Sequence, residues 1–178
     1  MSEPAAQALV ALGGNLGDRA ATLGLALRAL DELPSTRILA VSPAYDTDPV
    51  GRTDQPAFLN LCAALETALG PRALLERCLA IETALGRVRT VRDGPRTCDL
   101  DLLFHGSRSM DEPGLILPHP RWSGRSFVVF PLRDLLQMAP LASERSWDWL
   151  RAEAARAEVT RDGLRPWTGP IPWTRASR

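Results

Sequence analysis

Two hydrophobic periods alternate between residues 7 and 105, and each change of period marks the boundary of a predicted element. Apolar, β-branched or alternating runs at residues 7–12, 36–45, 57–67 and 97–105 predict strands. Between them, residues 19–33 and 71–85 repeat apolar side chains every three or four positions, which predicts two helices with one apolar face each. The predicted order is therefore strand, helix, strand, strand, helix, strand.

Residues with strong positional preferences bound the two predicted helices. Asp18 is placed to cap the first helix, and Pro34 ends it because proline lacks the N–H that a helix interior needs. Gly70 and Pro71 open the second helix, and Gly86 closes it. These boundaries agree with the changes of hydrophobic period.

This order of elements is that of the split βαβ unit. We therefore predict an α+β fold, a ferredoxin-like βαββαβ antiparallel sheet in an α/β sandwich, with both helices on one face. The opposite face of the sheet is expected to be free for a ligand.

The remaining third of the chain is less regular. Residues 115–125 are predicted to form a proline-containing loop, and residues 126–136 are apolar but interrupted by Pro131, so they receive no assignment. Residues 146–157 are predicted to form a C-terminal helix. Residues 158–178 are expected to be an extended tail whose tryptophans pack down on the surface. No linker is evident, so residues 1–178 are expected to form a single domain.

Composition narrows the possible partners. At 178 residues, 45% apolar and 24% charged, the chain can build one domain with a sizeable core. The formal net charge is zero, which argues against nucleic acid or a membrane surface as a partner. No apolar run approaches membrane length, and the start has no basic and apolar leader. We expect a stand-alone monomer in the cytoplasm.

The use of arginine and cysteine excludes further classes. All 21 basic residues are arginine. Without lysine, the chain cannot contain a P-loop lysine, a kinase strand lysine or a Schiff base, so phosphate must be bound by arginine, a metal ion or the backbone. Cys62, Cys78 and Cys98 lie far apart in apolar runs, which predicts buried reduced thiols instead of zinc ligands or disulfides.

The most distinctive stretch is residues 87–101, in which four arginines and a Gly-Pro turn precede two acids. In a strand, Asp99 and Asp101 point to the same face with Cα atoms roughly 7 Å apart, close enough to share one hard cation or to bridge two. The upstream arginines suit a polyanion. A lone Asp-x-Asp would more simply pair with arginines across a solvated loop, so the rest of the sequence must decide.

Four further segments carry a resemblance. They are residues 11–18, residues 45–51 with 54–60, residues 81–89 with 94–101, and residues 117–121 with 125–127. In this order and at these intervals they resemble the 6-hydroxymethyl-7,8-dihydropterin pyrophosphokinase family of folate biosynthesis. The resemblance implies an enzyme with a ferredoxin-like α/β sandwich fold, which agrees with the order of elements. It also implies that ATP donates its β,γ-diphosphate to the hydroxymethyl oxygen of the pterin and leaves as AMP, with two Mg²⁺ ions bound.

The resemblance assigns roles to side chains in several sets. The positions that match the metal ligands are Asp99 and Asp101. The positions that match the catalytic arginines are Arg87 and Arg96. The positions expected to contact ATP are Glu82, Arg89, Arg92, His119 and Arg125. The positions expected to bind the pterin are Thr47, Val50, Phe58, Asn60 and Phe127.

The residues themselves support part of this assignment. Phe58 and Asn60 fall on one face of the strand predicted at residues 57–67, so one can stack on a flat ring while the other hydrogen-bonds to its edge. Phe58 and Phe127 could equally be core residues. Glu82 lies at the edge of the apolar stripe of its helix and could be a surface acid.

One loop departs from the family pattern, and two other functions stay open. The loop after Arg87 looks one residue shorter than in some members, and Asp93 stands where an aromatic residue is common, which adds repulsion toward a triphosphate. The chain could also be a different Mg²⁺-dependent nucleotidyl or phosphoryl transferase on the same fold, or a non-catalytic ferredoxin-like module that binds RNA on the open sheet face. The zero net charge and the acids on that face argue against the RNA module.

Overall fold

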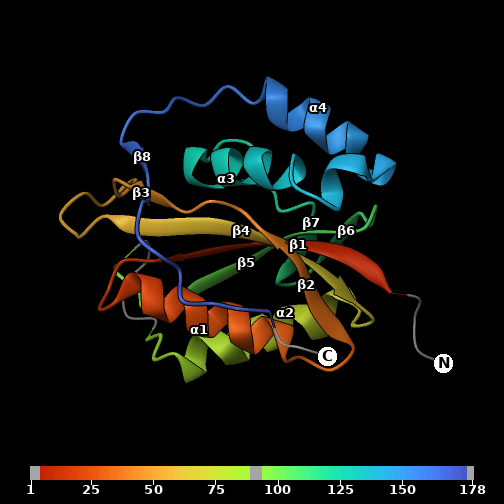
Figure 1. Ribbon diagram of the computed structural model, residues 1–178, viewed down its shortest axis with the longest axis horizontal. Coiled ribbons are helices and arrows are strands. Elements are labelled where there is room, and N and C mark those ends of the chain that lie inside the picture. The colour runs from red at the N-terminus through yellow and green to blue at the C-terminus, as the bar shows by residue number, and fades with distance from the viewer. Residues whose placement is uncertain (1–4, 89–93, 176–178) are drawn as a thin grey trace.

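The computed structural model describes residues 5–88 and 94–175, and Figure 1 shows a sheet with helices above and below it. The main sheet has one path of neighbouring strands. In spatial order these are β5 (Asp99–His105), β1 (Ala6–Gly14), β4 (Phe58–Thr67), β3 (Tyr45–Thr47) and β8 (Leu164–Pro166). β2 (Thr36–Val41) also pairs with β4, and every pairing in this sheet is antiparallel. The predicted antiparallel α+β fold is confirmed.

The stretch predicted as one strand at residues 36–45 forms two. β2 pairs with the end of β4 near Thr67, whereas β3 pairs with its beginning, between Phe58 and Asn60. Pro43 lies between the two strands, where its missing N–H interrupts the ladder. After this interruption β3 forms a separate short strand, and the loop at residues 48–57 connects it to β4.

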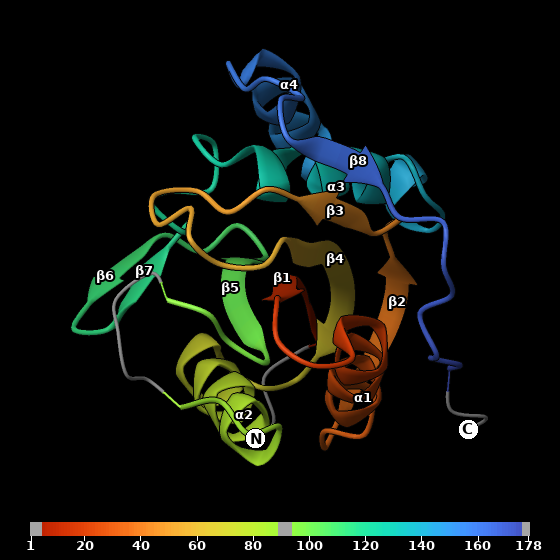
Figure 2. The ribbon, with the colours of Figure 1, turned by 90° about the vertical axis from the view of Figure 1, so that its left-hand side faces the viewer.

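Helices α1 (Arg19–Asp31) and α2 (Pro71–Ala84) cover one face of the sheet, as predicted (Figure 2). The Asp18 carboxylate accepts the N–H of Ala21 at 3.0 Å and caps α1, while Gly86, with φ of +80°, follows the end of α2. Apolar side chains of both helices and the sheet form the first core cluster. Its largest members include Leu12, Leu23, Leu27, Leu30, Leu59, Leu61, Leu65, Leu74 and Leu100.

The prediction that the other face of the sheet is free was wrong. There α3 (Ser126–Leu136) and α4 (Asp148–Arg156) build a second core cluster with β4 and β5. Pro131 lies inside α3, where it removes one helical hydrogen bond, but the apolar side chains around it are buried against the sheet and favour the helix. Cys62 and Ala64 are small residues on this face of β4, which lets α3 pack closely.

A bulge in β5 changes which side chains share a face. Leu9 pairs with Phe104 but Val10 pairs with Leu102, so Leu103 is an extra residue. Leu103 and Phe104 therefore both point into the second core cluster, so Phe104 does not lie on the face of Leu102, as strict alternation along the strand would require. The bulge lies beyond the two acids, which keep their predicted common face. His105 is buried with Nε2 2.8 Å from the carbonyl of Leu69, a structural position.

The C-terminal segment confirms an extended tail and adds a strand. Short 3-10 helices, Leu141–Ser143 and Arg145–Trp147, lead into α4, and β8 then pairs with β3. Figures 1 and 2 show the chain running from β8 past α1, where Trp167 and Trp173 pack against the first core cluster. A three-residue edge strand containing proline carries too little pattern to be predicted.

Other predictions can be compared with the structure. The segment predicted as a loop at residues 115–125 begins with β7 (Leu115–Leu117), which forms a hairpin with β6 (Met110–Glu112). All three cysteines are free and buried, as expected. None of the described helices is long and apolar enough to cross a membrane.

Candidate active site

Two cavities meet at one end of the sheet. The larger, about 930 Å³, lies between α2, β5 and the segment after β7, and the smaller, about 230 Å³, lies between the loop at residues 48–57, β4 and the start of α3. Three arginines line both cavities: Arg96, Arg121 and Arg125. A molecule in one cavity is thus within reach of the same cations as a molecule in the other.

The predicted site residues divide between the two cavities. The larger cavity is lined by Glu82, Arg87, Arg96, Asp99, Asp101, His119 and Arg125. The smaller cavity is lined by Thr47, Val50, Phe58, Asn60 and Phe127, in addition to the shared arginines. Arg89, Arg92 and the departure at Asp93 lie outside the described residues.

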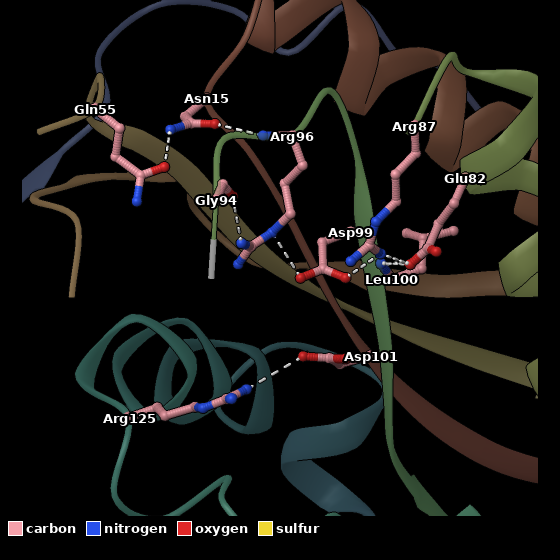
Figure 3. Close-up of polar contacts among 10 residues, drawn as sticks. All are labelled: Asn15, Gln55, Glu82, Arg87, Gly94, Arg96, Asp99, Leu100, Asp101 and Arg125. Atoms are coloured by element: carbon pink, nitrogen blue, oxygen red, sulfur yellow. Dashed lines mark hydrogen bonds and ion pairs between the residues drawn. The ribbon is translucent and has the colours of Figure 1, made fainter. Parts of the chain in front are cut away.

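Two acids and three arginines form the charged centre of the larger cavity (Figure 3). Arg87 donates to the Asp99 carboxylate, and Nε of Arg96 lies 2.9 Å from its second oxygen. Arg125 donates to Asp101 at 3.3 Å. Burial, and secondly the negative charge of Asp99, raise the pKa of the Asp101 carboxyl. The arginines hold together two acids that would otherwise repel each other.

Glu82 is a buried acid and not a surface one. Its side chain is 3% exposed, and its carboxylate accepts the N–H of Leu100 at 2.7 Å and pairs with Arg87. It therefore joins α2 to β5 and directs Arg87 toward Asp99 (Figure 3). The burial of Glu82 depends on its contact with Leu100 of β5. The helical period of α2 cannot reveal a contact with another element.

The segment after β7 supplies a histidine and two arginines. The N–H of His119 donates to the carbonyl of Leu103 at 2.9 Å, and its ring Nδ1 accepts the N–H of Arg121 at 3.2 Å. Burial lowers the pKa of the His119 imidazole, against the attraction of Asp101 and with the repulsion of Arg125 and Arg121. A neutral ring at physiological pH is therefore favoured. Arg121 was not predicted as a site residue, although it lies within one of the matched segments.

Beside the arginines that it shares with the larger cavity, the smaller cavity presents two aromatic rings and a neutral amide. Asn60 and Thr47 are both buried, and the Asn60 amide donates to the Thr47 hydroxyl at 2.7 Å. The guanidinium groups of Arg96 and Arg125 lie 4.7 Å and 5.6 Å from the ring centroids of Phe58 and Phe127. Two aromatic rings and a fixed amide can bind a planar, hydrogen-bonding heterocycle.

Gly13 explains how the amide fits. It lies in β1 opposite both Asn60 and Asp99, between the two cavities. A Cβ atom at this position would come within 2.3 Å of the Asn60 side-chain oxygen. The glycines at positions 13, 14 and 17 by themselves suggest a turn behind the site, but Gly13 lies within β1, in the strand between Asn60 and Asp99.

Asn15 is a second residue that sequence reasoning missed. Its amide nitrogen donates to the side chain of Gln55 at 3.0 Å and to the carbonyl of Pro56 at 2.9 Å, while its amide oxygen accepts the N–H of Arg96 at 2.9 Å (Figure 3). It joins the loop of the smaller cavity to the arginine of both. The signal available in the sequence was an asparagine directly after Gly-Gly. The amide of such a residue needs hydrogen-bond partners once it is buried.

The donor set of the larger cavity suits magnesium. Among the described residues there is no group of three or more His, Cys, Asp or Glu side chains that could enclose an ion. Asp99 and Asp101 face one cavity from alternate positions of β5. Mg²⁺ is commonly held by one or two carboxylates together with water and substrate phosphates, so two acids beside a cavity lined by arginines fit such a site.

Proteins of known name are similar to this chain. A protein named 2-amino-4-hydroxy-6-hydroxymethyldihydropteridine pyrophosphokinase from Pseudomonas aeruginosa is 50% identical over 126 residues, 71% of this chain and 78% of that one. The protein of the same name from Bacillus subtilis is 41% identical over 160 residues, 90% of this chain and 89% of that one.

Solved structures agree on the fold. Wild-type HPPK-DHPS of Plasmodium falciparum with STZ-DHP has a TM-score of 0.57 at 11% identity, over 92% of this chain and 45% of that chain. The present chain thus spans less than half of that protein.

The sequence match identifies the family. Residues 9–137 match the family described as 7,8-dihydro-6-hydroxymethylpterin-pyrophosphokinase, in agreement with the resemblance of the four segments. Since this match covers well over half of the described chain, the chain belongs to the 7,8-dihydro-6-hydroxymethylpterin pyrophosphokinase family.

Proposed function

We propose that this chain transfers the β,γ-diphosphate of ATP to the hydroxymethyl group of 6-hydroxymethyl-7,8-dihydropterin, giving the pterin diphosphate and AMP for folate biosynthesis. The observation that carries this assignment is the junction of the two cavities. One is lined by paired acids and arginines, the other by aromatic rings and an amide, and Arg96 and Arg125 border both. The larger cavity is assigned to ATP and the smaller to the pterin.

Asp99 and Asp101 are the proposed ligands of two Mg²⁺ ions. The ions would offset the negative charge of the triphosphate and make the pterin hydroxyl a better nucleophile. In this scheme the carboxylates of Asp99 and Asp101, which pair with arginines in the structure, would hold the ions.

The arginines stabilise the charge that shifts during transfer. The pterin hydroxyl oxygen attacks the β-phosphorus and gives its proton to solvent. The bond from that phosphorus to the oxygen shared with the α-phosphate breaks, and this oxygen leaves with both bonding electrons as part of AMP. Arg87 and Arg96, released from Asp99, can donate to the phosphates, and Arg125 and His119 border the same cavity. Arg89 and Arg92 remain predicted auxiliary contacts.

The smaller cavity orients the pterin. Phe58 and Phe127 would stack on the ring, and the Asn60 amide, held by Thr47, would read its polar edge. Val50 is 68% exposed near the beginning of the loop, where its backbone can close over a bound ring. Holding the hydroxymethyl group in line with the β-phosphorus replaces a bimolecular encounter by an oriented one.

The product distribution tests the proposal. Protein, ATP, Mg²⁺ and the hydroxymethyl dihydropterin are incubated, and nucleotides are separated by ion-exchange chromatography. We expect AMP in equal amount to pterin diphosphate, no reaction without pterin, and reversible loss with EDTA. Formation of ADP, or turnover that ignores the pterin, would contradict the assignment and favour a different transferase.

A binding module for RNA has no support in the structure, because α3 and α4 cover the sheet face on which RNA was expected to bind. The cytoplasmic location and the monomeric state stay predictions from the sequence.

A further inference from the structure

The loop at residues 48–57, which borders the smaller cavity, is anchored by a very short strand. β3 has three residues and lies between β4 and β8. Alternation along β3 points Thr47 toward the cavity, where it accepts a hydrogen bond from Asn60, and points Asp46 to the opposite face, beside α1. One face of β3 therefore serves the cavity, and the other is available to hold the loop in place.

Arg19, the first residue of α1, joins the two ends of this loop. One guanidinium nitrogen donates to the carbonyl of Ala57 at 2.8 Å, and another donates to the Asp46 carboxylate at 3.2 Å. Ala57 directly precedes β4, and Asp46 lies in β3 just before the loop. A single side chain thus spans the base of the loop and sets the separation of its ends.

The C-terminal segment covers this link. The ring of Trp167 lies 5.5 Å from the Arg19 guanidinium, and Arg165 pairs with Asp48 at 2.7 Å and with Asp46 at 3.6 Å. The side chains of Arg19 and Asp46 are only 22% and 23% exposed. Such shielding makes the pair stronger than a fully solvated one.

The matched family region does not extend to this cover. Residues 9–137 match the family, so Arg165 and Trp167 lie beyond the match. Nothing about the family match therefore assigns a role to the contacts that β8 makes with the loop.

We propose that Arg19, Asp46 and Trp167 form a loop clamp that positions residues 48–57 for the pterin and sets the affinity for the pterin without affecting ATP. The inference rests on the proposed function, which assigns the pterin to the smaller cavity. None of the three residues is among the described residues that line either cavity, so they act through the loop as positioning residues. The ATP cavity lies along β5 and α2, and β5 is the edge strand farthest from β3 and β8; among the described lining residues it shares only Arg96, Arg121 and Arg125 with the smaller cavity.

Arg19→Met tests the clamp, because methionine keeps an unbranched side chain against Trp167 but removes both hydrogen bonds. We expect the Kd and the KM for the pterin to rise about tenfold, since a loop shift of about 1 Å weakens several contacts together. The KM for ATP and the kcat at saturating pterin should stay within about twofold of the parent values. Pterin affinity is measured by fluorescence titration with 6-hydroxymethylpterin in the presence of Mg²⁺ and a non-hydrolysable ATP analogue.

A matched control removes an arginine of the same kind from another part of the sheet. Arg37 pairs with Glu66 between β2 and β4, and these side chains are 59% and 36% exposed. Arg37→Met should change neither substrate's KM. In the double variant Arg19→Met with Asp46→Asn, the pterin Kd should be no higher than in Arg19→Met alone, because both changes break the same link.

Several results would overturn the clamp. Equal changes in the KM values for ATP and pterin, or an unchanged pterin Kd, would exclude it. If Arg19→Met does not fold, judged by circular dichroism, Asp46→Asn carries the test, with an expected rise of about threefold because the bond to Ala57 remains.

Phe127→Ala separates failure of the clamp from failure of the proposed function. If Phe127→Ala weakens pterin binding and Arg19→Met does not, only the clamp is wrong. If both variants bind the pterin normally, the assignment of the smaller cavity is wrong as well.

Discussion

The two cavities share Arg96 and Arg125 but are held together in opposite ways. In the larger cavity, charged side chains hold one another: Arg87 and Arg96 engage Asp99, and Arg125 engages Asp101. In the smaller cavity, neutral hydrogen bonds set the geometry, chiefly those of Asn60 with Thr47 and of Asn15 with the loop. Ion pairs thus hold the walls of the larger cavity, and hydrogen bonds between neutral groups hold those of the smaller one.

This difference indicates how each half meets its ligand. Charged groups in a partly buried cavity need partners, because an unpaired buried charge costs several kcal/mol. In the proposed function, phosphates and cations would therefore replace the ion pairs of the larger cavity as partners of these charged groups. The neutral groups of the smaller cavity keep their mutual contacts, so this half is pre-formed and loses little on binding a flat ring.

The strongest test of the charged half is removal of either acid. Asp99→Asn and Asp101→Asn should each lower turnover about 10³-fold or more, because neutral amides bind Mg²⁺ poorly. The fold should persist, since the side chains are 19% and 33% exposed and support no core contact. Turnover is measured as AMP formation across a Mg²⁺ titration, with circular dichroism as the check on folding. Parent-like activity in either variant would remove that acid from the metal site.

The arginines that engage Asp99 allow a matched comparison between the halves. Arg87→Ala and Arg96→Ala should both lower kcat about 10²-fold through loss of phosphate stabilisation. Only Arg96 also stacks on Phe58, so only Arg96→Ala should change the KM for the pterin. Steady-state kinetics with each substrate varied in turn would reveal this split. Identical changes in both variants would contradict the idea that Arg96 serves both cavities.

The neutral half should respond in binding more than in turnover. Phe127→Ala removes one stacking surface and should raise the pterin Kd about tenfold, or about 1.4 kcal/mol. The Kd for ATP should not change, because Phe127 does not line the larger cavity within the described structure. Equilibrium titration with each ligand separately makes the comparison. Weaker ATP binding would mean that the two halves are less separate than their walls suggest.

The smallest effect on catalysis is expected from a change at Tyr45, which begins β3 just before the loop at residues 48–57. Its hydroxyl donates to Asp134 on α3, and burial first, then this hydrogen bond, raise the pKa of Tyr45 to about 12. Tyr45→Phe should lower the free energy of unfolding by about 1 kcal/mol with little change in kcat. Urea unfolding of the parent and of Tyr45→Phe at neutral pH measures this difference in the free energy of unfolding.

The same tyrosine predicts a pH dependence. An acid whose pKa is raised by folding stabilises the protein below its unfolded pKa of 10.0 and ceases to do so as the pH rises toward about 12. The difference in stability between the parent and Tyr45→Phe should therefore shrink over that range. A difference that is constant from pH 9 to pH 12 would exclude this linkage.

Local pattern was enough for most of the fold and for the shared face of predicted site residues within one strand. Hydrophobic period and capping residues predicted both helices over Arg19–Asp31 and Pro71–Ala84 to within two residues of their ends. Alternation predicted the common face of Asp99 and Asp101, and that of Phe58 and Asn60, because these pairs are two residues apart in one strand. The predicted site residues on other elements came from the resemblance of the four segments to the family.

Tertiary structure alone decided what depends on partners far apart in the chain. The cover of α3 and α4 over the second sheet face, the buried link from Glu82 to Leu100, and the contacts of Asn15 and Arg19 with one loop all join segments that no local period connects. Burial energy overrode Pro131 in α3, and the bulge at Leu103 reversed the face of Phe104. A sequence period records which side of its own element a residue occupies. The element that meets it there is set only by packing of the whole chain.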